Sequence, residues 1–353
     1  MPPRTATARL PGWVAGLLLL LVSTLLSVAA AEVASRAFWS LRYGVPFGKP
    51  GRILYAYYPE LERVDRKRPA HGDEFYDVLI LGGSTLNERW SQVQRALGEQ
   101  LAYHGHRNVR MFNLAIQAQT SRDSRLKYAA LRGPRFDLVL VYDGINDTRT
   151  NNVPPELFRE DYGHYRWYET VNIMAAYHGP ARFALPYTLR YLALGVRQAR
   201  RKDRYLPPEA PREEWLQYGR DVRSAASFEH NLGAILQLAS RRGDRVLLMT
   251  FATYVPPNYS AEAFKAKRLD YGLHLSPIEE WGRPADVLAA VAAHNRIVRD
   301  LAAAHEEVLL VDQASLMAGS PLYFNDVCHL TVAGSSRFAE NLLPAVLPTF
   351  PTR

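Results

Sequence analysis

Short apolar runs recur along the chain and alternate with amphipathic stretches. Five runs rich in Val, Leu and Ile lie at residues 76–82, 109–115, 136–142, 245–251 and 307–312. Near-continuous apolar runs bounded by Gly, Asp or Asn are typical of strands buried on both faces of a parallel sheet. Because helical patterns lie between them, we expect a three-layer α/β/α sandwich with a parallel sheet.

The helical patterns place apolar residues three or four positions apart, as on one face of a helix. The first such face comprises Leu86, Trp90, Val93, Leu97 and Leu101. Residues 222–241 and 285–304 precede the fourth and fifth apolar runs, and a last helix is expected to begin about Val332.

Two stretches interrupt this alternation, residues 151–220 and 254–283. The first is rich in aromatic residues and proline, and we expect it to lie over the carboxyl ends of the strands, where ligands bind in open α/β sheets. Its basic, helix-like part contains Arg190, Arg197, Arg200, Arg201, Lys202 and Arg204. These side chains fit either contact with anionic lipid or a solvated helix face.

The N-terminal part carries a charge-free apolar run over residues 10–31, preceded by Arg4 and Arg9. About 20 residues span a bilayer, whereas a signal-peptide core has about 7 to 15. We therefore expect a signal anchor at 1–35, a connecting segment at 36–72 and an α/β domain at 73–350 outside the cytoplasm. Small residues at 29–31 also fit cleavage and secretion, and a buried helix is the third alternative.

Composition adds little about partners. The net charge of +8 is spread along the chain, which favours a solvated surface, and no nucleic-acid partner is expected. Cys328 is the single cysteine, so neither an intrachain disulfide nor a cysteine-based zinc site can form.

Ser84 follows the first apolar run through Gly82 and Gly83. By itself it reads as a helix N-cap, and the stretch lacks the lysine of a phosphate-binding P-loop. Asn146 follows the third run, two residues after Gly144. It could close a turn, or aim its side-chain amide at the space above Ser84, where an oxyanion forms in acyl transfer.

Asp326 and His329 lie three residues apart before the last helix. A carboxylate beside one ring nitrogen of a histidine orients the ring and leaves the other nitrogen to take a proton. This pair would supply the base that a serine needs to act as a nucleophile.

The motifs "LGGST", "NLAIQAQTS", "GIND" and "DVCH", in this order, resemble the conserved blocks of the SGNH/GDSL hydrolase superfamily, with "HNRIVRDLA" in its penultimate helix. The resemblance implies a flavodoxin-like sandwich that hydrolyses esters or amides through an acyl-enzyme, with no metal and no organic cofactor. Ser84, Asp326 and His329 would be catalytic. The oxyanion hole would comprise the amides of Ser84 and Ala118 and the side chain of Asn146.

Two positions depart from the family pattern. Gly83 stands where the family usually has Asp, and Ala118 stands where it has the oxyanion-hole glycine. Alanine keeps the amide but resists positive φ, so we expect the hole to survive only if Ala118 has ordinary dihedral angles. Loss of one such donor costs about 2.7 to 4 kcal/mol of transition-state stabilisation.

The leading hypothesis is a membrane-anchored serine esterase acting on an acylated glycan, a lipid or a small ester. An O-acyltransferase with the same serine and a non-catalytic, membrane-anchored binding protein are the alternatives. "NDT" begins at Asn146, and a glycan there would fill the proposed hole. This favours a bacterial periplasm or cell surface over a eukaryotic secretory pathway.

Overall fold

A five-stranded parallel sheet forms the centre of the protein, for which a computed structural model describes residues 11–351. The strands are β1 (Tyr76–Gly82), β2 (Val109–Asn113), β3 (Leu138–Tyr142), β4 (Arg245–Met249) and β5 (Leu309–Val311). Their order is β2-β1-β3-β4-β5, as in flavodoxin-like sheets. The prediction of a parallel sheet is confirmed, with the first strand at its predicted bounds and the others shorter.

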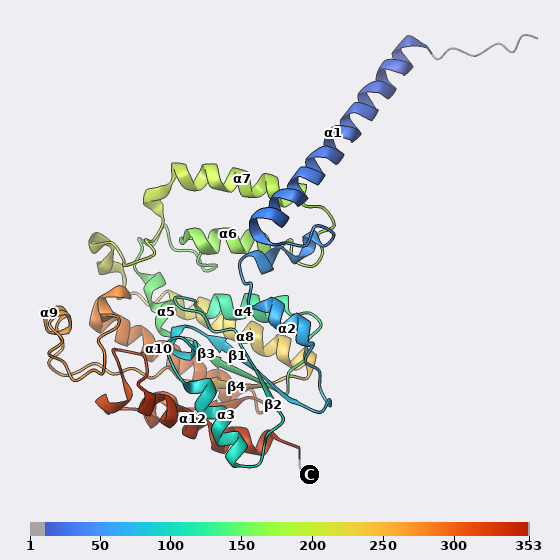
Figure 1. The fold of residues 1–353 in the computed structure, drawn as a ribbon. Coiled ribbons are helices and arrows are strands. Elements are labelled where there is room, and N and C mark those ends of the chain that lie inside the picture. Colours follow the sequence, from blue (N-terminus) through green and yellow to red (C-terminus); the bar gives the residue numbers. More distant parts are fainter. Residues whose placement is uncertain (1–10, 352–353) are drawn as a thin grey trace, which may run out of the picture.

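Helices cover both faces of the sheet (Figure 1). On one face lie α4 (Ser121–Ala130) and α8 (Ser224–Arg242), with α10 (Pro284–Ala304) packed beside α8. On the other face lie α3 (Val93–Tyr103) and α12 (Val332–Val346), which pack against each other. The predicted three-layer sandwich is therefore confirmed.

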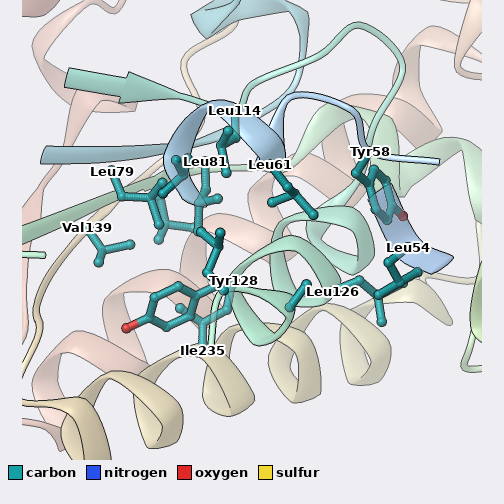
Figure 2. Close-up of a cluster of buried hydrophobic side chains, with 14 of the residues drawn as sticks. Leu54, Tyr58, Leu61, Leu79, Leu81, Leu114, Leu126, Tyr128, Val139 and Ile235 are labelled. Atoms are coloured by element: carbon teal, nitrogen blue, oxygen red, sulfur yellow. The ribbon is translucent and has the colours of Figure 1, made fainter. Parts of the chain in front are cut away.

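Alternate residues of the strands face the two helical layers, as the period of a strand requires. Leu79 and Leu81 of β1 belong to the cluster under α4 and α8, which Figure 2 shows together with Tyr128 and Ile235. Val78 and its neighbours of the same parity pack into the second cluster, under α3 and α12. Since both faces of the central strands β1 and β3 are buried, these two strands read as nearly continuous apolar runs.

The prediction of a helix from Leu86 onward is wrong for the first part of that stretch. Residues Ser84–Leu86 form the short 3-10 helix η2, and α3 begins only at Val93. Asn87 Oδ1 accepts a hydrogen bond from the backbone N–H of Arg89 at 2.9 Å. This Asx turn competes with helix formation, because the side chain takes an N–H group that a helix would use. Trp90 therefore lies in the turn and not on the helix.

The insertion after β3 has two parts. Its first part, α5 (Ile145–Thr148) and η3 (Arg149–Asn151), lies at the carboxyl edge of the sheet but precedes the stretch 151–220 for which that position was expected. Its helices α6 (Arg166–Ala175) and α7 (Leu185–Arg200) pack against each other, and α7 also contacts the N-terminal helix (Figure 1). This helical part lies above the α4 side of the sandwich.

The N-terminal helix α1 (Gly12–Tyr43) continues well beyond the apolar run. It is the one helix of the described residues that is long and apolar enough to cross a membrane, with mean hydropathy 2.4 over a window of which none is buried. A signal sequence would have the same properties. Next come η1 (Pro50–Ala56) and α2 (Leu61–Lys67), whose residues Ile53 and Leu61 are buried in the core.

The remaining short helices lie in connections. They are η4 (Lys202–Arg204), η5 (Glu213–Tyr218), α9 (Ala261–Lys265), η6 (Ile278–Glu280), α11 (Gln313–Leu316), η7 (Pro321–Tyr323) and η8 (Leu347–Thr349).

Candidate active site

Three of the residues singled out from the sequence form a hydrogen-bonded chain at the carboxyl edge of the sheet. Ser84 Oγ lies 2.8 Å from His329 Nε2, and His329 Nδ1 lies 2.7 Å from Asp326 Oδ2. All three side chains are buried, and Ser84 retains 7% of its exposed surface. The serine hydroxyl can donate to His329 Nε2 when the opposite ring nitrogen donates to the carboxylate.

Local backbone structure holds each member of this chain. Ser84 lies two residues after the end of β1. Gly82, the last residue of that strand, is required because a Cβ there would lie 2.5 Å from the carbonyl oxygen of Tyr142. Asp326 Oδ1 accepts the amides of Cys328 and His329, so the tight turn before α12 orients its own carboxylate. These contacts help to fix the positions of Ser84 and Asp326.

The environment of His329 favours its charged form. Burial lowers its pKa, whereas the hydrogen bond and the negative charge of Asp326 raise it. Burial also raises the pKa of the Cys328 thiol, so Asp326 is the partner that carries the negative charge at neutral pH. An imidazolium formed when His329 takes a proton would therefore be stabilised in place.

The side-chain amide of Asn146 lies beside Gly83, the residue before Ser84. Its Nδ2 donates to the carbonyl oxygen of Gln119 at 2.8 Å, and its Oδ1 accepts from Trp281 Nε1 at 2.9 Å. Because the indole N–H can only donate, it fixes which end of the Asn146 amide is the oxygen. One N–H of Nδ2 is left for a ligand.

Gly83 makes this position of Asn146 possible. A Cβ at residue 83 would lie 2.7 Å from Asn146 Nδ2, which is closer than real Cβ contacts allow. Glycine at position 83 is thus matched to Asn146. Glycine is required at position 144 for a similar reason, since a Cβ there would lie 2.8 Å from Phe251 Cβ.

Ala118 has φ of 61°, so the condition under which the oxyanion hole was expected to survive, ordinary dihedral angles at Ala118, is not met. Alanine tolerates the left-handed region at a cost of about 1 to 2 kcal/mol, and the main chain here keeps a conformation suited to glycine. Within residues 11–351 neither the Ala118 amide nor the Ser84 amide donates a hydrogen bond to the protein. Both donors are therefore free for a ligand.

Three further residues, which the motifs did not reveal, complete the site. The ring of Trp90 stacks on His329 with centroids 4.8 Å apart, Trp281 orients Asn146, and the amide of Ser276 donates to Asp326 Oδ2 at 3.0 Å. Trp281 and Ser276 come from the long loop at 254–283. The aromatic character of Trp90 and Trp281 was visible in the sequence, but nothing in the pattern indicated their partners.

A buried polar layer lies beneath the site, at the starts of α4 and α5. Asp147 accepts from Ser121 Oγ at 2.6 Å and from Tyr162 at 2.8 Å, and burial raises its pKa to about 6. Asp123 accepts from the hydroxyl groups of Tyr58 and Tyr168 and from the amide of Thr120. This layer ties the loop that carries Ala118 to the insertion.

Asp326, Cys328 and His329 also form the one group of potential metal ligands within residues 11–351, with ligand atoms within 4.8 Å of one another. Both ring nitrogens of His329 already contact Asp326 and Ser84. A metal ion at His329 would therefore compete with the contact to the serine.

No protein family model matches the chain, and no curated protein matches it in sequence. Several solved structures are similar in fold. A GDSL-like lipase from Bacteroides thetaiotaomicron shares 14% identity, covering 83% of this chain and all of that one, with TM-score 0.46. The lipase/acylhydrolase from Enterococcus faecalis shares 14% identity, covering 79% and 100%, with TM-score 0.42. The acetylxylan esterase Axe2 from Geobacillus stearothermophilus shares 15% identity, covering 81% and 100%, with TM-score 0.41.

Proposed function

We propose that the protein is a serine esterase that cleaves O-acyl esters through an acyl-Ser84 intermediate. The observation that carries the proposal is the continuous hydrogen-bonded chain Ser84–His329–Asp326 beside free backbone amides. A binding protein has no evident need for a buried histidine held between a carboxylate and a serine hydroxyl. The activity therefore rests on the geometry of this site.

In the first step His329 takes the hydroxyl proton of Ser84 as Ser84 Oγ forms a bond to the ester carbonyl carbon. The carbonyl oxygen becomes an oxyanion, and we assign its stabilisation to the amides of Ser84 and Ala118 and to Asn146 Nδ2. When the intermediate collapses, the bond to the alcohol oxygen breaks, and His329 returns its proton to the leaving alcohol.

In the second step water takes the place of the alcohol. His329 removes a proton from this water, whose oxygen attacks the acyl carbon. Collapse releases the carboxylic acid and restores the Ser84 hydroxyl. Asp326 stays ionised throughout and stabilises the imidazolium form of His329.

We further propose a small acyl group, such as acetyl, on a glycan hydroxyl as the substrate. Ser84 is only 7% exposed, which leaves little room for a long acyl chain at the nucleophile. The leaving alcohol must lie beside His329, where Trp90 is 36% exposed and offers an aromatic surface for a sugar ring. If the apolar part of α1 anchors the chain, the site lies outside the cytoplasm.

The test is covalent labelling of the full chain in detergent with a fluorophosphonate, followed by peptide mass spectrometry and an assay with 4-nitrophenyl acetate. We expect the adduct at Ser84, and a loss of turnover of about 10³-fold or more in Ser84→Ala and His329→Ala. Ser91→Ala is the matched control, because this nearby serine is equally buried and its Oγ has no partner within the described residues.

Full activity in Ser84→Ala would contradict the assignment. A folded wild-type chain that neither takes the label nor turns over ester would instead support a non-catalytic binding role. Product analysis with an acetylated donor and a free glycan separates the remaining alternative, since an acyltransferase would acylate the glycan and an esterase would release acetate.

A further inference from the structure

The outer face of α7 is apolar although it is exposed. Leu189, Leu192 and Val196 are 58%, 56% and 54% exposed, and Phe183 just before the helix is 62% exposed. Their spacing of three and four places the three helical residues on one side of α7. The opposite side carries the buried Tyr187 and Leu194 and faces the protein, so α7 has two apolar faces and only one is covered.

The position of α7 relative to α1 indicates what covers the second face. Apart from the half-buried Val14, residues 12–30 of α1 are exposed, a helical length of about 28 Å that matches a bilayer core of about 30 Å. Contact with the protein begins at the next turn of α1. There the carboxylate of Glu32 accepts the amides of Ala184 and Leu185, at the start of α7. The apolar part of α1 therefore ends where α7 begins.

Two further hydrogen bonds hold α1 against α7. Trp39 Nε1 donates to Thr188 Oγ1 at 2.8 Å, and the hydroxyl groups of Tyr43 and Tyr191 lie 2.7 Å apart. The buried side of α7 rests on α6, and its outer side faces the space into which the free part of α1 projects (Figure 1). A bilayer crossed by α1 would therefore meet this outer side.

The charges at the end of α7 suit an anionic surface. Arg200, Arg201, Lys202 and Arg204 are exposed, and Asp203 is the one acidic residue among them. None of the four cations forms an ion pair with the described residues. Apolar side chains flanked by basic ones are typical of helices that lie in the interface of a membrane.

We propose that the outer face of α7 (Phe183, Leu189, Leu192 and Val196, with the basic cluster 200–204) binds the surface of the bilayer that α1 crosses. The occupant is lipid, with its anionic headgroups near the basic cluster. This contact would hold the α/β domain in one orientation above the membrane. It does not depend on the esterase activity proposed for Ser84.

The test uses the full chain reconstituted into phosphatidylcholine vesicles with and without phosphatidylglycerol. Leu192→Cys carries an environment-sensitive fluorophore, and nitroxide-labelled lipid serves as quencher; the native Cys328 is fully buried. Tyr103→Cys is the matched control, since Tyr103 is 86% exposed at the end of α3, on the other side of the sheet (Figure 1).

We expect emission at shorter wavelength and strong lipid quenching at position 192, and neither at position 103. Replacing Arg200, Arg201 and Lys202 by alanine should reduce the quenching at position 192 in the anionic vesicles. A probe at 192 as water-exposed as that at 103 would overturn the proposal. So would shielding that rises with the protein-to-lipid ratio together with energy transfer between labelled copies, because the occupant would then be a second copy of the chain.

Discussion

Ala118 and Gly83 show how single residues adapt to each other at this site. Ala118 has a backbone conformation that favours glycine. Residue 83 is a glycine, and the absence of a side chain there leaves space for Asn146. Asn146 Nδ2 lies beside residue 83, and the Ala118 amide has no hydrogen-bond partner within residues 11–351. The residues at positions 83 and 118 are therefore compatible with the proposed oxyanion hole.

Replacing Ala118 by Gly tests whether only its main chain matters. We expect turnover of 4-nitrophenyl acetate to be retained, because the amide stays in place. The free energy of unfolding should change by less than about 1 kcal/mol, since relief of strain offsets the larger entropy of the unfolded chain. Urea titration and steady-state kinetics measure both quantities.

Ala118→Val is the companion variant. A β-branched residue strongly disfavours positive φ, so the amide should move and turnover should fall. Unchanged turnover in this variant would show that the amide of residue 118 is not a donor to the oxyanion.

At the scale of elements, the insertion after β3 supports the loops that carry the site. Tyr162 reaches Asp147 at the start of α5, and Tyr168 reaches Asp123 in the first turn of α4. Asp123 in turn closes a capping box with Thr120, two residues after Ala118. The helical part of the insertion thus connects the contact between α1 and α7 to the proposed oxyanion hole.

Tyr162→Phe should destabilise the fold by about 1 to 3 kcal/mol, because the buried Asp147 carboxylate loses a donor. Since this hydrogen bond opposes the effect of burial, the pKa of Asp147 should rise above its value of about 6. Urea unfolding at pH 7 measures the stability. Tyr177→Phe is the control, because the Tyr177 hydroxyl makes no hydrogen bond with residues 11–351, and an equal loss in both variants would contradict this role for Tyr162.

At the scale of the whole molecule, α10 links several parts of the domain through His294. Its Nε2 lies 2.9 Å from Ser224 Oγ of α8, and its Nδ1 lies 3.2 Å from the carbonyl oxygen of Gly144. Burial lowers the pKa of His294 to about 4, so the folded protein holds it neutral. The unfolded chain takes up this proton near pH 6.5, which couples stability to pH.

Between about pH 6.5 and 4 the unfolded state binds the proton that the folded state excludes, so the contribution of His294 to stability falls as pH falls. The loss is about 2 kcal/mol between pH 7.5 and pH 5. His294→Gln should reduce the change in unfolding free energy over this interval by about that amount, measured by urea titration at both pH values. His305→Gln, at the half-buried C-cap of the same helix, is the control for a histidine substitution at this helix. Identical pH dependence in His294→Gln and wild type would rule out this linkage.

Several features follow from the sequence because they depend on local pattern. The apolar runs placed all five strands, and their continuity indicated burial on both faces, which only a covered parallel sheet provides. The residues after β1 and β3 could be paired from topology alone, since the carboxyl ends of neighbouring parallel strands meet at one edge. The proximity of Ser84 and Asn146 was predictable for this reason.

Tertiary structure alone decided the rest. Trp281 contacts Asn146 across 135 positions of sequence, and Trp39 of α1 contacts Thr188 across 149. Periodicity indicates which face of an element is buried but not which partner covers it, so neither contact could be read from the pattern. The conformation of Ala118 and the uncovered face of α7 also depend on distant neighbours. The sequence thus determined the layers and the chemical groups, whereas packing between distant segments decided how those groups are held and which surface stays open.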